Sequence, residues 1–376
     1  MTADTSKPDT PVARSSTRGM IGQGFYNAHS RPQLEASLAV LPFLDRAIED
    51  LRGQARSDTV TLADFGCSEG RNSILIMHHA IQKLQGGHTG AVHTVHSDLP
   101  TNDFTELLRG LRPNGVSVFG EANVYSSIVG GSMYDQLLPP DSVDLAMTFN
   151  AIAFFSKRPC PDLPGYILPN GPSRIRKNGI VTAEERAKFA KQADLDLTDF
   201  LLARADELRG GGHVLVQVFG VRDGAATTDG LYDLLNDAVC HFVETGYISA
   251  DTYRRYYQPI YLRNEEELVS PVISGGNPAS KLFELVESTS YEVAIDFVTE
   301  YQRSGDVQAY AKAYVAFFRA FTEAVLRAAL PADGNREQLI KDIYKKAEHL
   351  LMIRPELYPP RYLAVAMLLK RKPKTS

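Results

Sequence analysis

Two short segments carry residue types that can bind a nucleotide-like ligand. In Asp64-Phe-Gly-Cys-Ser-Glu-Gly70 an apolar, β-branched run ends in a glycine-containing turn. Glycine tolerates positive φ and lets a backbone approach a ligand closely. Asp98 ends the next apolar run, where a carboxylate can accept hydrogen bonds from both hydroxyls of a ribose. The pair predicts a nucleotide-type site, although a strand-ending turn for the glycines and a helix cap for Asp98 remain simpler alternatives.

The hydrophobic pattern predicts a sheet whose edge carries both segments. Helical spacing of apolar residues predicts helices at 31–51, 73–84, 104–111, 195–208, 230–245 and 307–330. Runs of apolar and β-branched residues predict strands at 59–66, 91–98, 116–119, 142–149, 213–219, 291–298 and 362–369. Alternation of the two favours the α/β class, with a doubly wound sheet of seven strands whose final pair closes as an antiparallel hairpin. The surplus helices predict an α-helical cap over one end of the sheet.

The same pattern divides the chain into a core and a cap that alternate along the sequence. We expect a mobile N-terminal arm at 1–20, because this stretch is rich in Ser, Thr and Pro and lacks the apolar region of a secretory signal. The core is expected at 21–164, 196–265 and 351–376, and the last of these segments contains the final strand and a tail. A cap insertion is expected at 165–195. A helical cap, with one strand near 291–298, is expected at 266–350.

Composition excludes several classes of partner. The net charge is −5 and no basic stripe is present, which argues against nucleic-acid binding. No apolar run approaches the roughly 20 residues that cross a membrane. Three widely spaced cysteines, Cys67, Cys160 and Cys240, suggest neither disulfides nor a metal site and favour a reducing, cytoplasmic location. The histidines lack ligand partners at metal-binding spacing, so no metal is expected.

Several ordered motifs resemble one known family, the plant-type carboxyl methyltransferases that act on salicylate, benzoate, jasmonate and related compounds, with N-methylating xanthine (theobromine) enzymes among their relatives. The family's Asp-Leu-Gly-Cys-Ser-Ser-Gly-Pro-Asn turn resembles Asp64–Asn72, and its Asn-Asp-Leu-Pro-x-Asn-Asp-Phe resembles Ser97–Phe104. Its Gly-Ser-Phe-Tyr-x-x-Leu-Phe-Pro is similar to Gly131–Pro139. The resemblance covers nearly the whole chain and implies the Rossmann-like fold of class I methyltransferases in a bacterial-like member of the family.

Carried over position by position, the resemblance implies S-adenosylmethionine as the cofactor and a small-molecule acid as the substrate. Met133 stands where the family has the Phe that stacks on adenine, and its polarizable sulfur can pack on an aromatic face. The implied cofactor contacts are Ser30, Asp64, Gly66, Asn72, Asp98, Leu99, Ser132 and Met133.

The implied substrate contacts are Tyr26, Gln33, Asn150 and Phe154. Gln33 matches the family's amide that holds the substrate carboxylate. Phe154 stands where the carboxyl enzymes have a tryptophan that donates a second hydrogen bond, and the chain contains no tryptophan. Asn150, where the family usually has Tyr, could restore that donor. Packing at the end of a strand is the simpler alternative for Asn150 and Phe154.

The mechanism expected from this resemblance is in-line methyl transfer to a carboxylate of a small aromatic or isoprenoid-like acid, giving a methyl ester. A carboxylic acid is already ionised at neutral pH, so no catalytic base is strictly required and orientation is the main contribution of the protein. The alternatives are N- or O-methylation of a small heterocycle or phenol, with His29 or Tyr26 as a base, and, more distantly, an NAD-dependent dehydrogenase or a binding-only protein. The resemblance also implies a homodimer.

Overall fold

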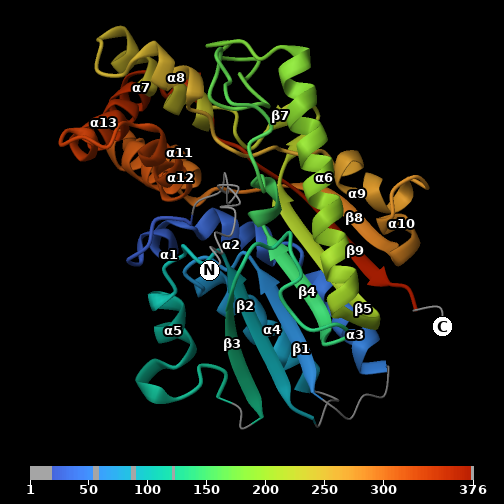
Figure 1. Ribbon diagram of the computed structural model, residues 1–376. Helices are drawn as coiled ribbons and strands as arrows, with labels where there is room; N and C mark the ends of the chain where they lie inside the picture. The colour runs from blue at the N-terminus through green and yellow to red at the C-terminus, as the bar shows by residue number, and fades with distance from the viewer. Residues whose placement is uncertain (1–18, 54–58, 86–89, 121–122, 374–376) are drawn as a thin grey trace, which may run out of the picture.

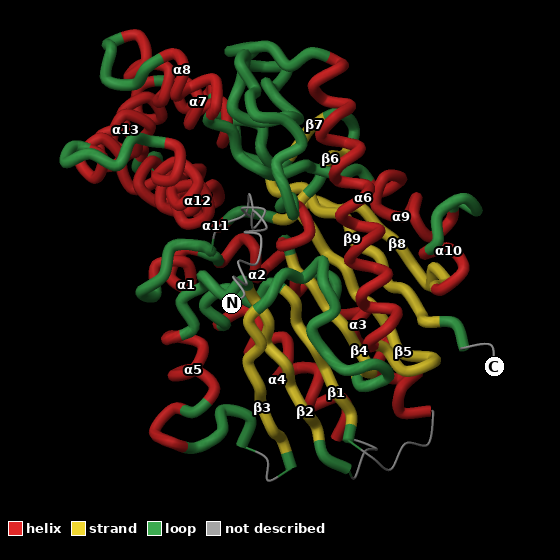
Figure 2. Tube along the Cα trace, in the orientation of Figure 1, coloured by secondary structure: helices red, strands yellow, loops and turns green. Residues whose placement is uncertain are grey.

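A mixed seven-stranded sheet forms the centre of the computed structural model, which describes residues 19–53, 59–85, 90–120 and 123–373. The strands lie in the order β3-β2-β1-β4-β5-β9-β8 (Figures 1 and 2). This arrangement confirms the predicted seven-stranded α/β fold. The strands are β1 Val60–Phe65, β2 Val92–Asp98, β3 Val124–Gly130, β4 Val143–Phe149, β5 Leu208–Phe219, β8 Phe283–Val293 and β9 Tyr362–Arg371, and a small separate ribbon pairs β6 Val221–Arg222 with β7 Ala225–Ala226.

Five neighbouring strands are parallel and the last two are antiparallel. β1 pairs in parallel with β2 and β4, and the pairing continues outward to β3 on one side and β5 on the other. β9 runs antiparallel to both β5 and β8, which confirms the predicted antiparallel hairpin. Because parallel strands all end at the same edge, the turn after β1 and the end of β2 lie side by side.

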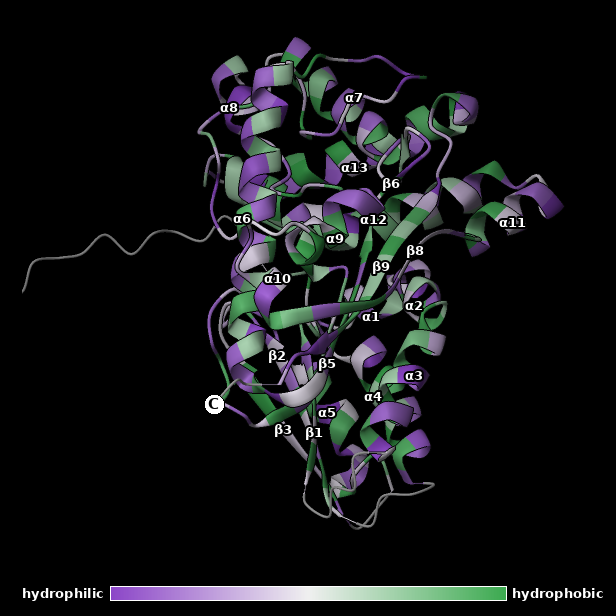
Figure 3. Cartoon of the chain, turned by 90° about the vertical axis from the view of Figure 1, so that its right-hand side faces the viewer, coloured by the Kyte–Doolittle hydropathy of each residue, from purple (hydrophilic) through white to green (hydrophobic). Residues whose placement is uncertain are grey.

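Burial follows position in the sheet. Every residue of β1 is buried, and β9 is buried along nearly its whole length, as expected for central strands covered on both faces. Figure 3 shows this hydrophobic character as green colour along β9, whereas the helices alternate between purple and green. The edge strand β3 is exposed at Tyr125, Ser126 and Ser127.

Helices cover both faces of the sheet. α3 Leu41–Gly53 and α4 Arg71–Gln85 pack on one face through a core that includes Leu44, Met77 and Leu62. α6 Ala183–Glu207 packs on the other face, where Phe200 and Leu201 meet Phe65 and Val214 (Figure 1). The smaller helices beside the sheet are α1 Phe25–His29, α2 Arg31–Leu38, α5 Thr105–Leu111, α9 Glu265–Ile273 and α10 Ala279–Leu282, with 3-10 turns η1 Pro113–Gly115, η2 Ala151–Ala153 and η3 Pro355–Leu357.

Five helices form a cap beyond the carboxyl ends of the parallel strands (Figures 1 and 2). α12 is the longest of them and packs against both α11 and α13, and α13 also packs against α7. α12 begins at a capping Asp306, whose side chain accepts from two backbone N–H groups. The cap helices are α7 Leu231–Glu244, α8 Ala250–Arg255, α11 Asp296–Ser304, α12 Val307–Ala329 and α13 Arg336–Ile353.

Two strand predictions were wrong in position. The segment 116–119 is not a strand, and β3 instead begins at Val124. The Ser-Ser pair of this exposed edge strand hid its pattern, whereas Val116 is apolar but 66% exposed. The strand expected at 291–298 is found at 283–293, because α11 begins at Asp296. Its glutamates Glu284 and Glu287 mark an edge strand that borders solvent rather than a continuous apolar run.

Helix boundaries also differ from the prediction. The single helix expected at 31–51 is two helices, α2 and α3, separated at Ala39 and Val40. The helix expected from residue 195 begins at Ala183, after a capping box between Thr182 and Glu185 that the sequence displays. The three glycines at 210–212 belong to β5, where the pairing with β4 shifts register. None of the helices that the structure describes combines the length and the apolarity that crossing a membrane requires.

Candidate active site

A pocket lies where the carboxyl ends of the parallel strands meet the cap, and its space, open solvent included, amounts to about 1040 Å³. Its sheet end is formed by Gly66, Ser68, Ser97, Asp98, Leu99, Gly131, Ser132 and Met133. Its cap end is formed by Phe154, Phe219, Thr228, Leu231, Tyr232, Phe317 and Phe321. Tyr26, Gln33 and Asn150 also line this pocket.

The glycine turn after β1 is shaped for close approach. Gly66 has a φ of 98°, and a Cβ at this position would collide with Ala151. Its backbone N–H donates to the Ser97 carbonyl at 2.8 Å, which ties the turn to the end of β2. Only glycine adopts this conformation without strain, so the backbone is bare on the pocket side.

Asp98 is fixed by the backbone around it. One of its carboxylate oxygens accepts the Ser68 N–H at 2.6 Å, and the other accepts the Leu99 N–H at 2.7 Å. Burial raises the pKa of the Asp98 carboxyl to about 6, and the two N–H groups oppose that rise. The carboxylate therefore lines the pocket in a fixed orientation with lone pairs left for a ligand.

Asp64 lies behind the turn. The structure does not place it in the lining of the pocket, and its side chain is 3% exposed. Burial raises the pKa of the Asp64 carboxyl to about 7, a hydrogen bond with Ser73 lowers it, and the charge of Asp98 raises it again. Its Oδ1 has no hydrogen-bond partner among the described residues. The Ser73 hydroxyl in turn lies 2.8 Å from Nδ1 of the buried His96.

Ser30 and Asn72 also lie outside the lining. The Asn72 amide donates to the Ser30 hydroxyl at 3.3 Å and so links α4 to the start of α2. Together with Asp64, these residues support the pocket from behind, and the other five residues with an implied cofactor role line it directly.

A buried ion pair holds the loop that carries Ser132 and Met133. Arg204 and Glu207 on α6 are 0% and 1% exposed in their side chains and lie 2.8 Å apart. Arg204 donates to the Met133 carbonyl at 2.7 Å, and Glu207 accepts the Leu137 N–H at 2.6 Å. The Arg204 guanidinium also lies over the Phe65 ring. The ion pair thereby satisfies the backbone of this loop from inside the core.

A second clamp positions Tyr26. The Glu69 carboxylate, which belongs to the glycine turn and is 1% exposed, accepts the Gly24 N–H at 2.6 Å and the Asn27 N–H at 2.9 Å. The Arg71 N–H donates to Asn27 Oδ1 at 3.2 Å. Burial raises the pKa of the Tyr26 hydroxyl well above its ordinary value. α1 is thus attached to the turn, with Tyr26 facing the pocket.

Asn150 presents a defined face to the pocket. It lies after β4 at a φ of 63°, and its Oδ1 accepts the Phe219 N–H at 3.1 Å and the Tyr362 hydroxyl at 3.0 Å. A backbone N–H can only donate, so the atom facing Phe219 must be the oxygen. The Nδ2 of Asn150 is then the group available to a ligand. Gln33 lines the same pocket, and its Oε1 is buried without a partner among the described residues.

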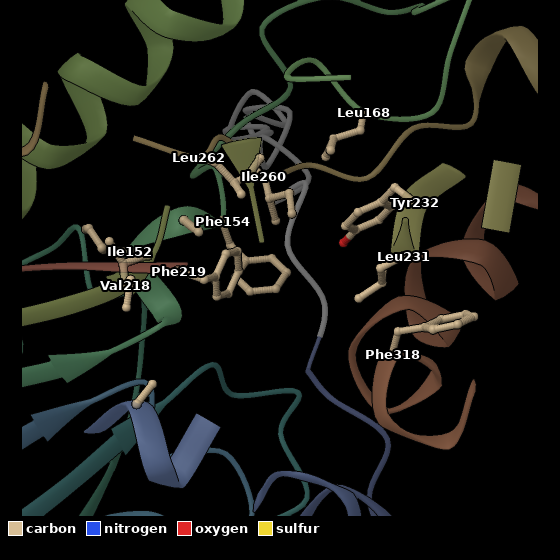
Figure 4. Close-up of a cluster of buried hydrophobic side chains, with 14 of the residues drawn as sticks. Ile152, Phe154, Leu168, Val218, Phe219, Leu231, Tyr232, Ile260, Leu262 and Phe318 are labelled. Carbon is tan, nitrogen blue, oxygen red and sulfur yellow. The ribbon is translucent and has the colours of Figure 1, made fainter. Parts of the chain in front are cut away.

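Phe154 brings no donor to this part of the pocket. Its side chain is 8% exposed, and its ring lies beside Phe219 in the apolar cluster of Figure 4. The lining contains one carboxylate, Asp98, and no Lys, Arg or His among the described residues. An anionic ligand group is therefore met by neutral donors only.

Most residues of the cap end could not be predicted from the sequence. Its residues come from β5, α7 and α12, and helical periodicity marks them only as apolar positions without distinguishing core from pocket. No group of three or more His, Cys, Asp or Glu side chains in the described parts of the chain is arranged to hold a metal ion.

The fold and this pocket define a Rossmann-like methyltransferase with a helical cap. Residues 15–372 match the model of the SAM dependent carboxyl methyltransferase family, and the chain belongs to this family. S-adenosylmethionine is therefore its cofactor, and the dehydrogenase alternative is wrong. The chain is 25% identical over 269 residues to gibberellic acid methyltransferase 2 of Arabidopsis thaliana, covering 66% of this chain and 68% of the relative.

Two further relatives agree. Indole-3-acetate O-methyltransferase 1 of Oryza sativa subsp. japonica is 25% identical over 302 residues, covering 73% of this chain and 74% of the relative. The solved structure of loganic acid methyltransferase with SAH superposes with a TM-score of 0.75 at 20% identity, covering 95% of this chain and 99% of that one. This structural likeness confirms the fold.

Proposed function

We propose that this enzyme converts a small, apolar-bodied carboxylic acid, aromatic or isoprenoid-like, into its methyl ester. The observation that carries the proposal is one pocket lined by polar groups of the sheet end, by apolar side chains of the cap end and by two neutral amides, Gln33 and Asn150. Relatives named for gibberellic acid, indole-3-acetate and loganic acid support a substrate of this kind.

The residues of the sheet end fit S-adenosylmethionine. The hydroxyls of Ser68 and Ser97, which line the pocket, are buried without partners among the described residues, so the site has polar atoms that a ligand can satisfy. We assign Asp98 to the ribose hydroxyls and Met133 to the face of the adenine. When bound, the cofactor supplies an electrophilic methyl group on a positively charged sulfur. Gly66, Asp98, Leu99, Ser132 and Met133 would hold it directly, and Ser30, Asp64 and Asn72 would support these residues from behind.

The protein contributes orientation and exclusion of water. Gln33 and Asn150 Nδ2 donate to the carboxylate oxygens, Tyr26 closes the same wall, and Phe154 covers the reacting atoms with an apolar ring. Because a carboxylic acid with a pKa near 4 is ionised at neutral pH, no side chain has to remove a proton. Alignment of this kind supplies roughly 7 to 11 kcal/mol in favourable cases.

Methylation of a phenol or a heterocyclic nitrogen fits the pocket less well. A phenol has a pKa near 10 and needs a base. No histidine lines the described pocket, and burial raises the pKa of Tyr26, so this tyrosine is a poor base.

The proposal is tested by methyl transfer from labelled S-adenosylmethionine to a panel of aromatic and aliphatic acids, phenols and heterocyclic amines. Alkali-labile label on an acid is the expected result, because esters hydrolyse in mild alkali. Stable label on a phenol or amine would replace the substrate class, and cofactor binding without transfer to any acceptor would support a binding-only role.

We also propose a homodimer in the cytoplasm, with core and cap segments that alternate along the chain. The boundaries differ from those expected, because α7 and α8 lie in the cap, whereas α9, α10 and β8 lie with the core. Three cysteines that form no disulfide support a reducing compartment. The proposed arm at 1–20 lies outside the described residues as far as position 18. Light scattering on purified protein tests the dimer, and fractionation of the native host tests the compartment.

A further inference from the structure

The cap end of the pocket is apolar except at the beginning of α7. In Figure 4 the rings of Phe154 and Phe219 lie on one side and Leu231 lies on the other. Phe317 and Phe321, which are one turn apart on α12, also line this end. Such a surface favours an apolar ligand body through burial alone.

Tyr232 interrupts this apolar lining with a hydroxyl. The residue is 1% exposed and lines the pocket, and Figure 4 shows its oxygen pointing into the space between the phenyl rings and α7. No hydrogen bond joins this hydroxyl to another of the described residues. Other buried tyrosine hydroxyls, such as those of Tyr166 and Tyr362, donate to Asp233 and Asn150. The Tyr232 hydroxyl instead lines the pocket, where a polar atom of a ligand can hydrogen-bond to it.

Thr228 adds a second hydroxyl at the same place. It is 5% exposed, lines the pocket, and its carbonyl accepts the Tyr232 N–H at 3.0 Å, which puts both residues on one turn. The Thr228 hydroxyl also lacks a partner within the described parts of the chain. The neighbouring Thr227, in contrast, donates its hydroxyl to Leu363, so it is already occupied.

We propose that Tyr232 and Thr228 form a specificity subsite for an uncharged oxygen, a hydroxyl or a carbonyl, on the body of the acid and remote from its carboxylate. The Tyr232 O–H donates to this oxygen, and the Thr228 hydroxyl can donate or accept. The inference rests on the proposed function for the place of the carboxylate, near Gln33 and Asn150. It narrows the substrate class to oxygenated acids with an apolar skeleton.

The charges around the pocket argue that this distal oxygen is neutral. No Lys, Arg or His lines the pocket in the described residues, and Asp98 at the sheet end is the one carboxylate. A second carboxylate or a phosphate buried against Phe317 and Phe321 would have no counter-charge, which is strongly unfavourable. A hydroxyl or a carbonyl needs only hydrogen bonds.

Matched acid pairs test the subsite through binding rather than turnover. The probes are phenylpropanoic acid with its para-hydroxy analogue and decanoic acid with its ω-hydroxy and ω-oxo analogues, titrated calorimetrically into the full-length protein with S-adenosylhomocysteine. We expect the wild type to bind the oxygenated member of at least one pair about tenfold more tightly than its parent. Tyr232→Phe, which removes only the hydroxyl, is expected to abolish that preference by weakening the oxygenated member alone.

Tyr314→Phe is the matched control. Tyr314 is also a buried tyrosine whose hydroxyl lacks a partner, but it does not line the pocket, so this variant should keep the preference. No preference in any pair, or equal weakening of both members by Tyr232→Phe, overturns the subsite. If Tyr232→Phe abolishes the binding preference but the acids are never methylated, the result supports the subsite and contradicts the proposed function.

Discussion

The sheet end of the pocket is held by backbone groups, whereas the cap end is held by the packing of side chains from distant segments. At the sheet end, Asp98 bonds the N–H groups of Ser68 and Leu99, and Gly66 bonds the carbonyl of Ser97. At the cap end, Phe219, Leu231 and Phe317 arrive from β5, α7 and α12. The backbone bonds of the sheet end fix one ligand closely. The side chains of the cap end can vary the shape of the pocket without disturbing the sheet end.

This difference predicts that changes at the two ends separate cofactor binding from acid binding. Variants of the sheet end should weaken the cofactor, and variants at the acceptor amides and the cap end should weaken the acid alone.

Arg204→Met should lower the free energy of unfolding by about 3 to 5 kcal/mol, since it leaves Glu207 charged and buried without its partner. The loop from Met133 to Leu138 should loosen as well. Urea unfolding followed by circular dichroism measures the first effect, and proteolysis of the loop measures the second. The double variant Arg204→Met/Glu207→Gln should regain part of the stability, and a double variant no more stable than Arg204→Met would contradict this account.

Asp98→Asn should weaken S-adenosylhomocysteine binding by about a hundredfold. The amide NH₂ of the variant would face the N–H of either Ser68 or Leu99, and the negative charge that accepts the ribose hydroxyls would be lost. Isothermal titration calorimetry measures the affinity. Asp103→Asn is the matched control, since Asp103 also accepts backbone N–H groups, from Gln23 and Thr105, but lies outside the pocket lining. Comparable losses in both variants would count against a specific role for Asp98.

Asn150→Asp should raise KM for the acid about thirtyfold and leave cofactor affinity within twofold. The change keeps an oxygen for the Phe219 N–H but replaces the Nδ2 donor with a negative charge that repels the substrate carboxylate. Steady-state kinetics at saturating cofactor measure the effect. Asn277→Asp makes the same chemical change away from the pocket and should be silent. A normal KM in Asn150→Asp would remove Asn150 from the substrate site.

Cofactor affinity should fall about tenfold between pH 7.5 and pH 6. Burial raises the pKa of Asp64 to about 7 and that of Asp98 to about 6, and a ligand with donor groups and a positive charge favours their ionised forms. Both carboxyls bind protons more tightly in the folded state than in the unfolded state. They therefore lower the free energy of unfolding as pH rises from about 4 to 7. Titration calorimetry between pH 7.5 and pH 6 measures the cofactor affinity. An affinity that does not change with pH would exclude a contribution from Asp64 and Asp98.

The local sequence was enough to predict the position of strands whose pattern of apolar and β-branched residues is continuous. β1, β2 and β4 were predicted almost to the residue because central parallel strands are buried on both faces and are therefore rich in apolar and β-branched residues. β3 and β8 were misplaced because strands at the edges of a sheet border solvent on one side and need no apolar run.

The sequence by itself determined the class of protein and the sheet end of the pocket, because the glycine turn and Asp98 act through conformations and backbone bonds encoded within a few neighbouring residues. Only the tertiary structure decided which atoms meet the acid. The orientation of the Asn150 amide depends on Phe219 and Tyr362, and the Tyr232 hydroxyl is recognised as unpartnered only when its surroundings are assembled. Packing between residues more than 60 positions apart sets these relations, and no local pattern encodes such packing.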